Sequence, residues 1–187
     1  MNIALHTAYF FRGDIIPCIV EVEATKGIGI RLVGLADSSV KETLLRVVTA
    51  IQALGFHIPG KKIVINVTPH GGHNEWAGAM RPKDGVEAFD LAIALGILIA
   101  TEQIPRPSWY RNGVDQVLFF AKVGLDGRLM APFTGIDGDS AAAVLSWQLR
   151  RDWAEIIGYP ADDNVMSIYS SEESLQDIIQ AIQDGNL

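Results

Sequence analysis

Residues 83–91 read KDGVEAFDL, and they run directly into the apolar segment AIALGILIA at residues 92–100. A polar turn with a glycine that opens onto a long apolar run is typical of the start of a buried helix. Such a turn brings backbone N–H groups, a helix N-terminus and acidic side chains to one place, where they can carry chemistry. Acidic residues are also favoured in a first helical turn for structural reasons alone. The stretch therefore predicts a core helix and leaves two interpretations of its carboxylates.

The composition limits the class of protein. Of the 187 residues 49% are hydrophobic, and we expect one domain over residues 1–187 with no AAA+ module. The formal net charge of −7 argues against direct nucleic-acid binding through a concentrated basic face. Cys18 is the single cysteine, which favours a reducing, cytoplasmic location. The apolar run is shorter than the ~20 residues that span a bilayer, so no membrane association is expected.

Hydrophobic periodicity predicts a mixed α+β domain. The first three strands are expected to form an antiparallel meander. Two helices begin with the spacing of a capping box, at Ser39 and Glu42 and at Ser170 and Glu173. The expected strands span residues 2–9, 15–24, 28–35, 62–67, 117–125, 128–130 and 165–169. The expected helices span residues 40–54, 88–101, 140–150 and 171–183.

Two groups of residues are candidates for chemistry. Glu87 and Asp90 are three residues apart at the expected helix start, close to Asp84, so a buried pair would act as general acid and base. Helix capping explains the same acids without chemistry. His70 and His73 lie in a loop rich in glycine and are weak candidates for a metal site, because zinc needs three or four ligands. The sequence otherwise indicates no metal and no cofactor.

Several segments together resemble the N-terminal domain of the magnesium-chelatase-like AAA+ ATPases, the ComM/YifB competence family. The resemblance is carried by VGLAD at 33–37, VKE at 40–42, IVINV at 63–67 with Pro69, AFDL at 88–91, IALGIL at 93–98 and GLDG at 124–127 with Pro132 and Gly135. It implies the ribosomal protein S5 domain 2-like fold, which the proteolytic domain of Lon shares. That fold has a mixed sheet with helices packed mainly on one side.

The resemblance to Lon also tests for a peptidase site. Lon-type proteases carry their serine in a Lys-Asp-Gly-Pro-Ser-Ala-Gly turn, and the matching turn here places Glu87 at the position of the nucleophile. The position of the activating lysine falls at Asp137. A Ser–Lys dyad needs a hydroxyl nucleophile and a desolvated amine, so these degenerate positions predict that no such catalytic residues are present. The chain also contains no Walker A motif.

The resemblance implies a non-catalytic accessory or oligomerisation domain. We expect self-association or a AAA+ ATPase partner, and a role in DNA processing or recombination. An alternative is a small hydrolase or metal-dependent enzyme that uses Glu87, Asp90 and the His70/His73 loop. A third interpretation is a nucleic-acid binder that uses Arg12, Lys61 and Lys62.

Overall fold

A computed structural model describes residues 1–11, 14–34, 38–69, 86–87, 89–107, 110, 117–130, 166–168 and 174–186. Within these residues the chain forms three α-helices and a mixed sheet, so the predicted mixture of helices and strands in an α+β domain is confirmed. The strands are β1 (Asn2–Phe11), β2 (Asp14–Lys26), β3 (Gly29–Gly34), β4 (Lys61–Pro69), β5 (Val86–Glu87), β6 (Val117–Phe119), β7 (Lys122–Val123), β8 (Leu129–Met130) and β9 (Met166–Ile168). The helices are α1 (Ser38–Ala53), α3 (Asp90–Ala100) and α5 (Leu175–Gln183).

The main sheet has the strand order β3-β4-β2-β1-β6-β9, and β5 adds to β1. Strand β2 runs antiparallel to both β1 and β4, whereas β3 runs parallel to β4. The predicted meander is therefore wrong for its third strand, because β4 lies between β2 and β3. A parallel pair needs a crossover connection, and α1 supplies it between β3 and β4. The pattern of the first three strands alone does not contain that information.

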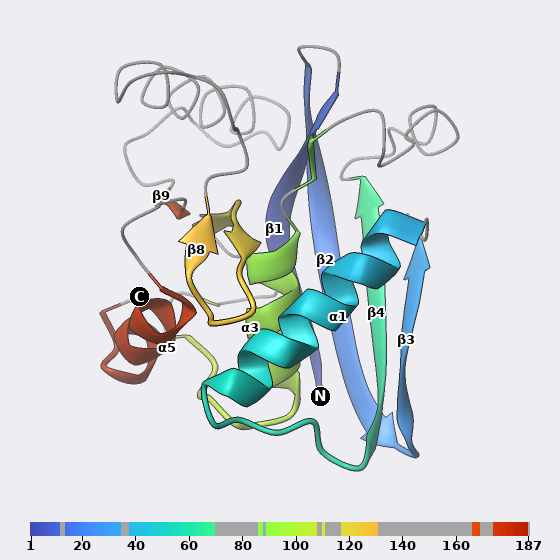
Figure 1. Cartoon of the computed structure of the whole chain (residues 1–187), viewed down its shortest axis with the longest axis vertical. Coiled ribbons are helices and arrows are strands. Elements are labelled where there is room, and N and C mark those ends of the chain that lie inside the picture. Colours follow the sequence, from blue (N-terminus) through green and yellow to red (C-terminus); the bar gives the residue numbers. More distant parts are fainter. Residues whose placement is uncertain are drawn as a thin grey trace.

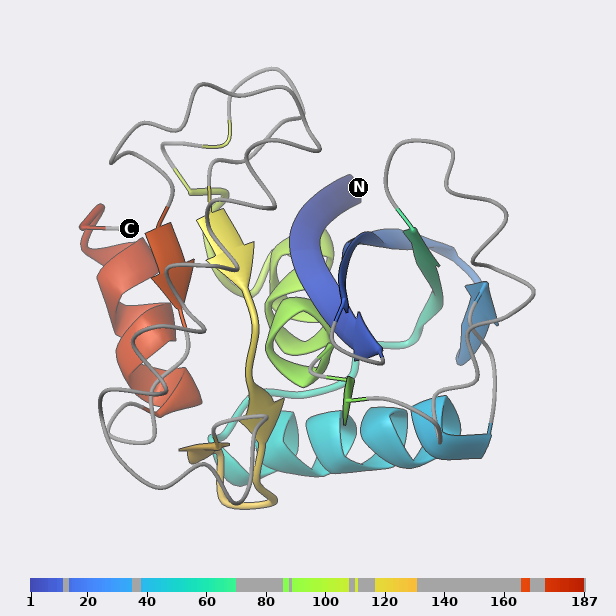
Figure 2. The ribbon, with the colours of Figure 1, turned by 90° about the horizontal axis from the view of Figure 1, so that it is seen from above.

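Two helices cover the same face of the sheet. Figure 1 shows α1 and α3 in front of the strands, and Figure 2 shows α3 between α1 and the middle of the sheet. Helix α3 packs on β1, β2 and α1. Alternate residues of β2 face the core, since Cys18, Val20, Val22 and Ala24 are buried while Glu23 is exposed.

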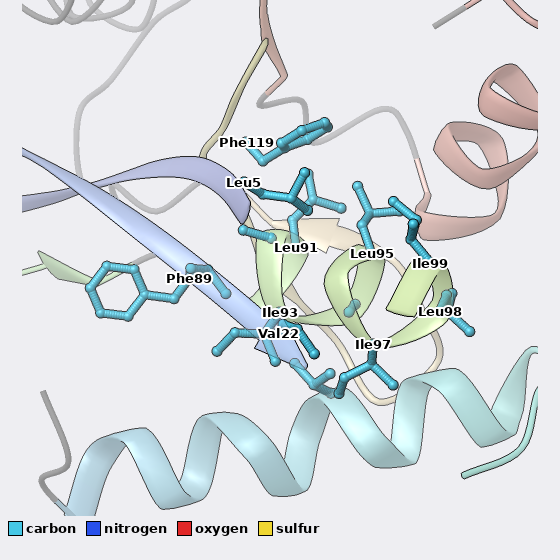
Figure 3. Close-up of a cluster of buried hydrophobic side chains, with 14 of the residues drawn as sticks. Leu5, Val22, Phe89, Leu91, Ile93, Leu95, Ile97, Leu98, Ile99 and Phe119 are labelled. Atoms are coloured by element: carbon cyan, nitrogen blue, oxygen red, sulfur yellow. The ribbon is translucent and has the colours of Figure 1, made fainter. Parts of the chain in front are cut away.

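Helix α3 is the centre of the hydrophobic core. Each residue from Asp90 to Ala100 is buried, so the predicted core helix is confirmed. Figure 3 shows Leu91 beside Leu5 and Phe119, and Ile97 extending toward α1. A Cβ atom added to Gly96 would lie 2.6 Å from Cγ2 of Val22. Gly96 therefore permits the close approach of α3 to the sheet.

Two local predictions need correction. Ser39 lies inside α1 and not at its N-cap, because the helix already begins at Ser38. The last helix begins at Leu175, and its capping box is formed by Ser174 and Asp177 instead of Ser170 and Glu173. The predicted helix at residues 140–150 lies outside the described residues. None of the helices in the described ranges has the length and hydropathy to cross a bilayer.

Candidate functional site

The turn before α3 differs from the prediction in one respect. Val86 and Glu87 form the short strand β5, in which Glu87 pairs with Tyr9 of β1. The helix begins only at Asp90, after Phe89 as its N-cap. Glu87 therefore lies in a strand before the helix, and the expected placement of Glu87 and Asp90 together at one helix start is wrong. Residues 86–87 pair with β1 as a short strand, and the helix begins only after this pairing ends.

Asp90 is the carboxylate that the structure places at the start of α3. It is 0% exposed. Its Oδ2 atom lies 3.3 Å from Nε of Arg46 and its Oδ1 atom lies 3.4 Å from Nη2 of the same guanidinium. The backbone N–H of Val123 donates to Oδ2 at 3.1 Å. Both oxygens of Asp90 thus accept hydrogen bonds from protein donors.

Arg46 is itself held in position by α1. Its Nη2 atom donates to Oγ1 of Thr43 at 3.0 Å, one helical turn earlier. Residues three apart on a helix are neighbours, so this hydrogen bond directs the guanidinium along the helix surface toward α3. The side chain of Arg46 is 30% exposed, which leaves part of the guanidinium in contact with solvent. A buried charge is costly unless it is paired, and Arg46 provides that pairing.

The chain segment at residues 120–123 completes the surroundings of Asp90. The sequence predicts one strand from residue 117 to 125, but the structure has two, β6 and β7, with Phe120 and Ala121 between them. The carbonyl of Ala121 accepts the N–H of Leu91 at 3.2 Å. The first N–H groups of a helix have no partner within it, and here the segment between β6 and β7 satisfies one of them. The strand is interrupted because its backbone turns to the start of α3.

Burial raises the pKa of Asp90, because the charged form loses its hydration. Arg46, the N–H of Val123 and the charge of Lys122 oppose this effect, and the pKa of Asp90 remains above its ordinary value. The pair connects α1, α3 and β7, since Arg46, Asp90 and Val123 come from these three elements. An enclosed carboxylate with both oxygens engaged is suited to fixing helices in position, and a general base would need an oxygen free to reach a substrate.

The other candidate residues have different outcomes. Asp84, His70, His73 and Asp137 lie outside the described residues, and for Glu87 the structure describes the backbone only. Among the described residues, no three His, Cys, Asp or Glu side chains gather as a metal site. Cys18 is buried, and burial raises the pKa of its thiol, so it is an unreactive core residue.

The sequence analysis did not identify Arg46 and Thr43. A signal for them was present in Asp90, because an ionisable residue inside an apolar helix requires a partner. Arg46 also lies beside the apolar positions of α1, one residue before the buried Val47. The sequence does not say which of the 15 Lys and Arg residues reaches Asp90.

Comparison with known proteins gives a consistent result. The sequence model of the family described as subunit ChlI of Mg-chelatase matches residues 20–137, which is more than half of the chain. The match includes β3, α1, β4 and α3, and therefore the residues Thr43, Arg46, Asp90 and Val123.

Individual relatives extend this match. The competence protein ComM of Haemophilus influenzae is 31% identical over 167 residues, which cover 86% of this chain and 28% of ComM. The uncharacterized protein YifB of Escherichia coli is 35% identical over 129 residues, 68% of this chain and 22% of YifB. YifB of Salmonella typhimurium is 37% identical over 106 residues, 56% of this chain and 19% of that protein. The chain thus spans about a quarter of the length of these relatives.

Proposed function

Since the chain belongs to the magnesium-chelatase-like family of ComM and YifB, we propose that it is a non-catalytic accessory domain that works with a AAA+ ATPase. Its task in this proposal is to associate with itself or with the ATPase, and the energy of nucleotide hydrolysis comes from the partner. The absence of a Walker A motif from these 187 residues supports that division.

The proposal includes the finer fold assignment. We assign residues 1–187 to one domain of the ribosomal protein S5 domain 2-like type, the type shared with the proteolytic domain of Lon. The mixed sheet, the β3-α1-β4 crossover and the position of α1 and α3 on one face support this assignment. The cellular setting in this proposal is cytoplasmic. Because one relative is called a competence protein, the proposed process is the processing or recombination of DNA.

The observation that carries the non-catalytic assignment is the state of Asp90. The turn that holds a nucleophile in Lon-type proteases leads here to a buried carboxylate that Arg46 and Val123 engage completely. Glu87 and Asp137 occupy the positions of the Lon serine and lysine in the sequence, and neither side chain can act as that residue does. The start of α3 then serves to hold α1, α3 and β7 together.

The test combines binding and turnover. The purified chain is mixed with a purified AAA+ module from a ComM/YifB relative, and complex formation and ATP hydrolysis are measured. We expect a complex, and we expect the chain alone to hydrolyse neither ATP nor fluorogenic peptides. Peptide turnover that Glu87→Gln abolishes, while Gln176→Glu on the exposed surface of α5 leaves it intact, would overturn the proposal in favour of a hydrolase.

A further inference from the structure

Charge is distributed unevenly along this chain. Residues 152–187 contain none of the 15 Lys and Arg residues, whereas they contain eight of the 22 acidic residues. The remaining 151 residues are close to neutral, so the net charge of −7 arises from the C-terminal part. The acidic residues of this part are Asp152, Glu155, Asp162, Asp163, Glu172, Glu173, Asp177 and Asp184.

Helix α5 and its C-cap present two of these eight acidic residues, Asp177 and Asp184, to solvent. Its buried side is apolar and belongs to the core, and it consists of Leu175, Ile178, Ile179 and Ile182. The opposite side is exposed and carries Asp177, Gln180 and Asp184. No basic residue lies in the last turn of the helix. We call Asp177, Gln180 and Asp184 the acidic face.

Four basic residues surround the end of the sheet where β2 finishes and β4 begins, next to β3. Because side chains alternate between the two faces of a strand, Lys26 and Lys61 belong to the face of Ala24 and Ile63, and Lys62 and Arg31 belong to the other face. Lys26 at the end of β2 is opposite Lys61 of β4, and Lys62 is opposite both Thr25 and Gly29. Lys26, Lys62 and Arg31 are exposed, and Lys61 is half-buried. Residues 24–36 and 43–74 contain no acidic residue in the sequence, and the nearest exposed acid among the described residues is Glu23 of β2, which is separated from Arg31 by Val64 of β4. We call Lys26, Arg31, Lys61 and Lys62 the basic edge.

Apolar side chains accompany the basic edge. Ile28 is 90% exposed in the turn between β2 and β3, and Val33 on β3 is 43% exposed. Within the described ranges β3 pairs with β4 alone, so it is an edge strand. Exposed apolar surface with a polar rim marks many protein–protein contacts, and Ile28 and Val33 add apolar surface beside the basic edge.

The basic edge and the acidic face lie on opposite sides of the molecule. In the strand order, β3 is the first strand and β9 the last. Both Figure 1 and Figure 2 place α5 beside β9, far from β3 and on the other side of α3. One copy of the chain can therefore use both surfaces at once, each with a different neighbour.

We propose that the basic edge of one copy docks on the acidic face of a second copy. The contact joins two different surfaces, so it is heterologous and leads to a ring if the rotation closes or to a filament if it does not. Opposite charges at the two surfaces bring the copies together and fix their orientation. This inference rests on the proposed function, because it names the surface through which the domain associates with itself.

Two other roles for the basic edge are less well supported. A nucleic acid would meet four cationic residues on a chain with a net charge of −7, which is a small basic surface for phosphate neutralisation. A charged residue on an edge strand also protects it from pairing with another strand, and Arg31 is the member of the basic edge that lies on β3. That protective role does not explain why the complementary acidic surface stands at the far side of the same sheet.

The experiment exchanges the charges of the two surfaces in the full 187-residue chain. The first variant is Lys26→Glu/Lys62→Glu, and the second is Gln180→Lys/Asp184→Lys. All four side chains are exposed, and cations near the end of α5 suit the helix dipole. Sedimentation velocity is measured for each variant alone and for an equimolar mixture, at low and high salt.

We expect each variant alone to associate about tenfold more weakly or worse than the unaltered chain, because like charges then face each other. The equimolar mixture should recover association, since each basic surface again meets an acidic one. High salt should weaken the unaltered assembly. Lys41→Glu on the exposed surface of α1 changes the net charge as Lys62→Glu does, and it should leave association unchanged.

Several results would overturn the inference. If the chain associates and neither variant weakens it, the contact lies elsewhere. If the chain stays monomeric at all concentrations but binds the AAA+ module, the docking inference fails and the proposed function stands. If it does neither, both fail. Binding of a labelled DNA duplex that Lys26→Glu/Lys62→Glu abolishes, without self-association, would assign the basic edge to nucleic acid.

Discussion

Helices α3 and α5 are stabilised in opposite ways. Helix α3 is buried along its whole length and has no side-chain cap, so it depends on contacts with β1, β2, α1 and the segment at residue 121. Helix α5 buries one side only and begins with a complete capping box, in which Ser174 and Asp177 satisfy each other's backbone N–H groups. Helix α3 is therefore stabilised by tertiary contacts, whereas α5 has a capping box of its own at its N-terminus.

The aspartates at the two helix starts show the same contrast. Burial raises the pKa of Asp90, although Arg46 and Val123 partly compensate. The hydroxyl and the backbone N–H of Ser174 lower the pKa of the exposed Asp177. One residue type in the first turn of two helices thus has a pKa shifted in opposite directions. Position in a first turn therefore does not define the role of a carboxylate, and the following predictions test this comparison.

The largest effect is expected from Arg46→Met. The substitution keeps an unbranched apolar stem, removes the guanidinium and leaves the buried Asp90 without its cation. Removing one partner of a buried ion pair typically costs about 3 kcal/mol or more of unfolding free energy. The midpoint of thermal unfolding should fall, by roughly 2–4 °C for each kcal/mol in a chain of this size. Urea titration at neutral pH measures the loss of free energy directly.

The matched control for Arg46→Met is Arg46→Met/Asp90→Asn. Asparagine is neutral and retains an oxygen that can accept the N–H of Val123, so the double variant should be more stable than Arg46→Met alone. The loss of unfolding free energy caused by Arg46→Met should also be smaller at acidic pH, where Asp90 becomes protonated. If Arg46→Met is as stable as the unaltered chain, α3 does not depend on this pair.

A smaller effect is expected from Gly96→Ala. The added methyl group would lie 2.6 Å from Val22, and a helix rigidly packed on a sheet cannot absorb that overlap. Overpacking costs about 1–3 kcal/mol, and the better helix propensity of alanine offsets part of it. Val22→Ala should reduce the cost of Gly96→Ala, which a double-mutant cycle by urea unfolding would detect.

Gly60→Ala is the control for the substitution at Gly96. A Cβ atom at Gly60 meets no other atom within 4 Å, so this variant should stay within about 0.5 kcal/mol of the unaltered chain. A Gly96→Ala variant that is equally stable would mean that α3 can move away from the sheet, contrary to its description as the fixed centre of the core.

The same two helices show how far the sequence predicts the structure. Long periodic segments were predicted well, and α3, β2 and β4 lie close to their expected positions, because hydrophobic burial is read from local pattern. The pairing of β3 with β4 was missed, since strand partners are set by crossover connections and not by the strand itself. Arg46 was missed for the same reason, because its partner is 44 residues away. The start of α5 was placed too early, because Ser170 and Glu173 have the same capping-box spacing as Ser174 and Asp177, four residues ahead of them.

Ser174→Ala should destabilise α5 more than any other part of the chain. It removes the hydroxyl that accepts the N–H of Asp177 and donates to its carboxylate. Loss of an N-cap typically costs about 1 kcal/mol. Amide hydrogen exchange should become faster in α5 and remain unchanged in α3. Ser174→Thr is the control, since threonine keeps the hydroxyl that accepts from the N–H of Asp177 and donates to its carboxylate. Faster exchange in both helices alike would contradict the independence of their starts.

The smallest effect is the dependence of stability on pH, and its sign differs between the two aspartates. The folded chain keeps a proton on Asp90 at pH values where the unfolded chain has lost it. The contribution of Asp90 to the free energy of unfolding therefore decreases as the pH rises above 3.8, the ordinary pKa of an aspartate. The contribution of Asp177 to the free energy of unfolding is present above pH 3.8 and is lost as the pH falls through the lowered pKa of Asp177 in the folded chain. Unfolding free energies of Asp90→Asn and Asp177→Asn, each compared with the unaltered chain from acidic to neutral pH, should therefore change with slopes of opposite sign. Slopes of the same sign would mean that the two first-turn carboxylates share one environment.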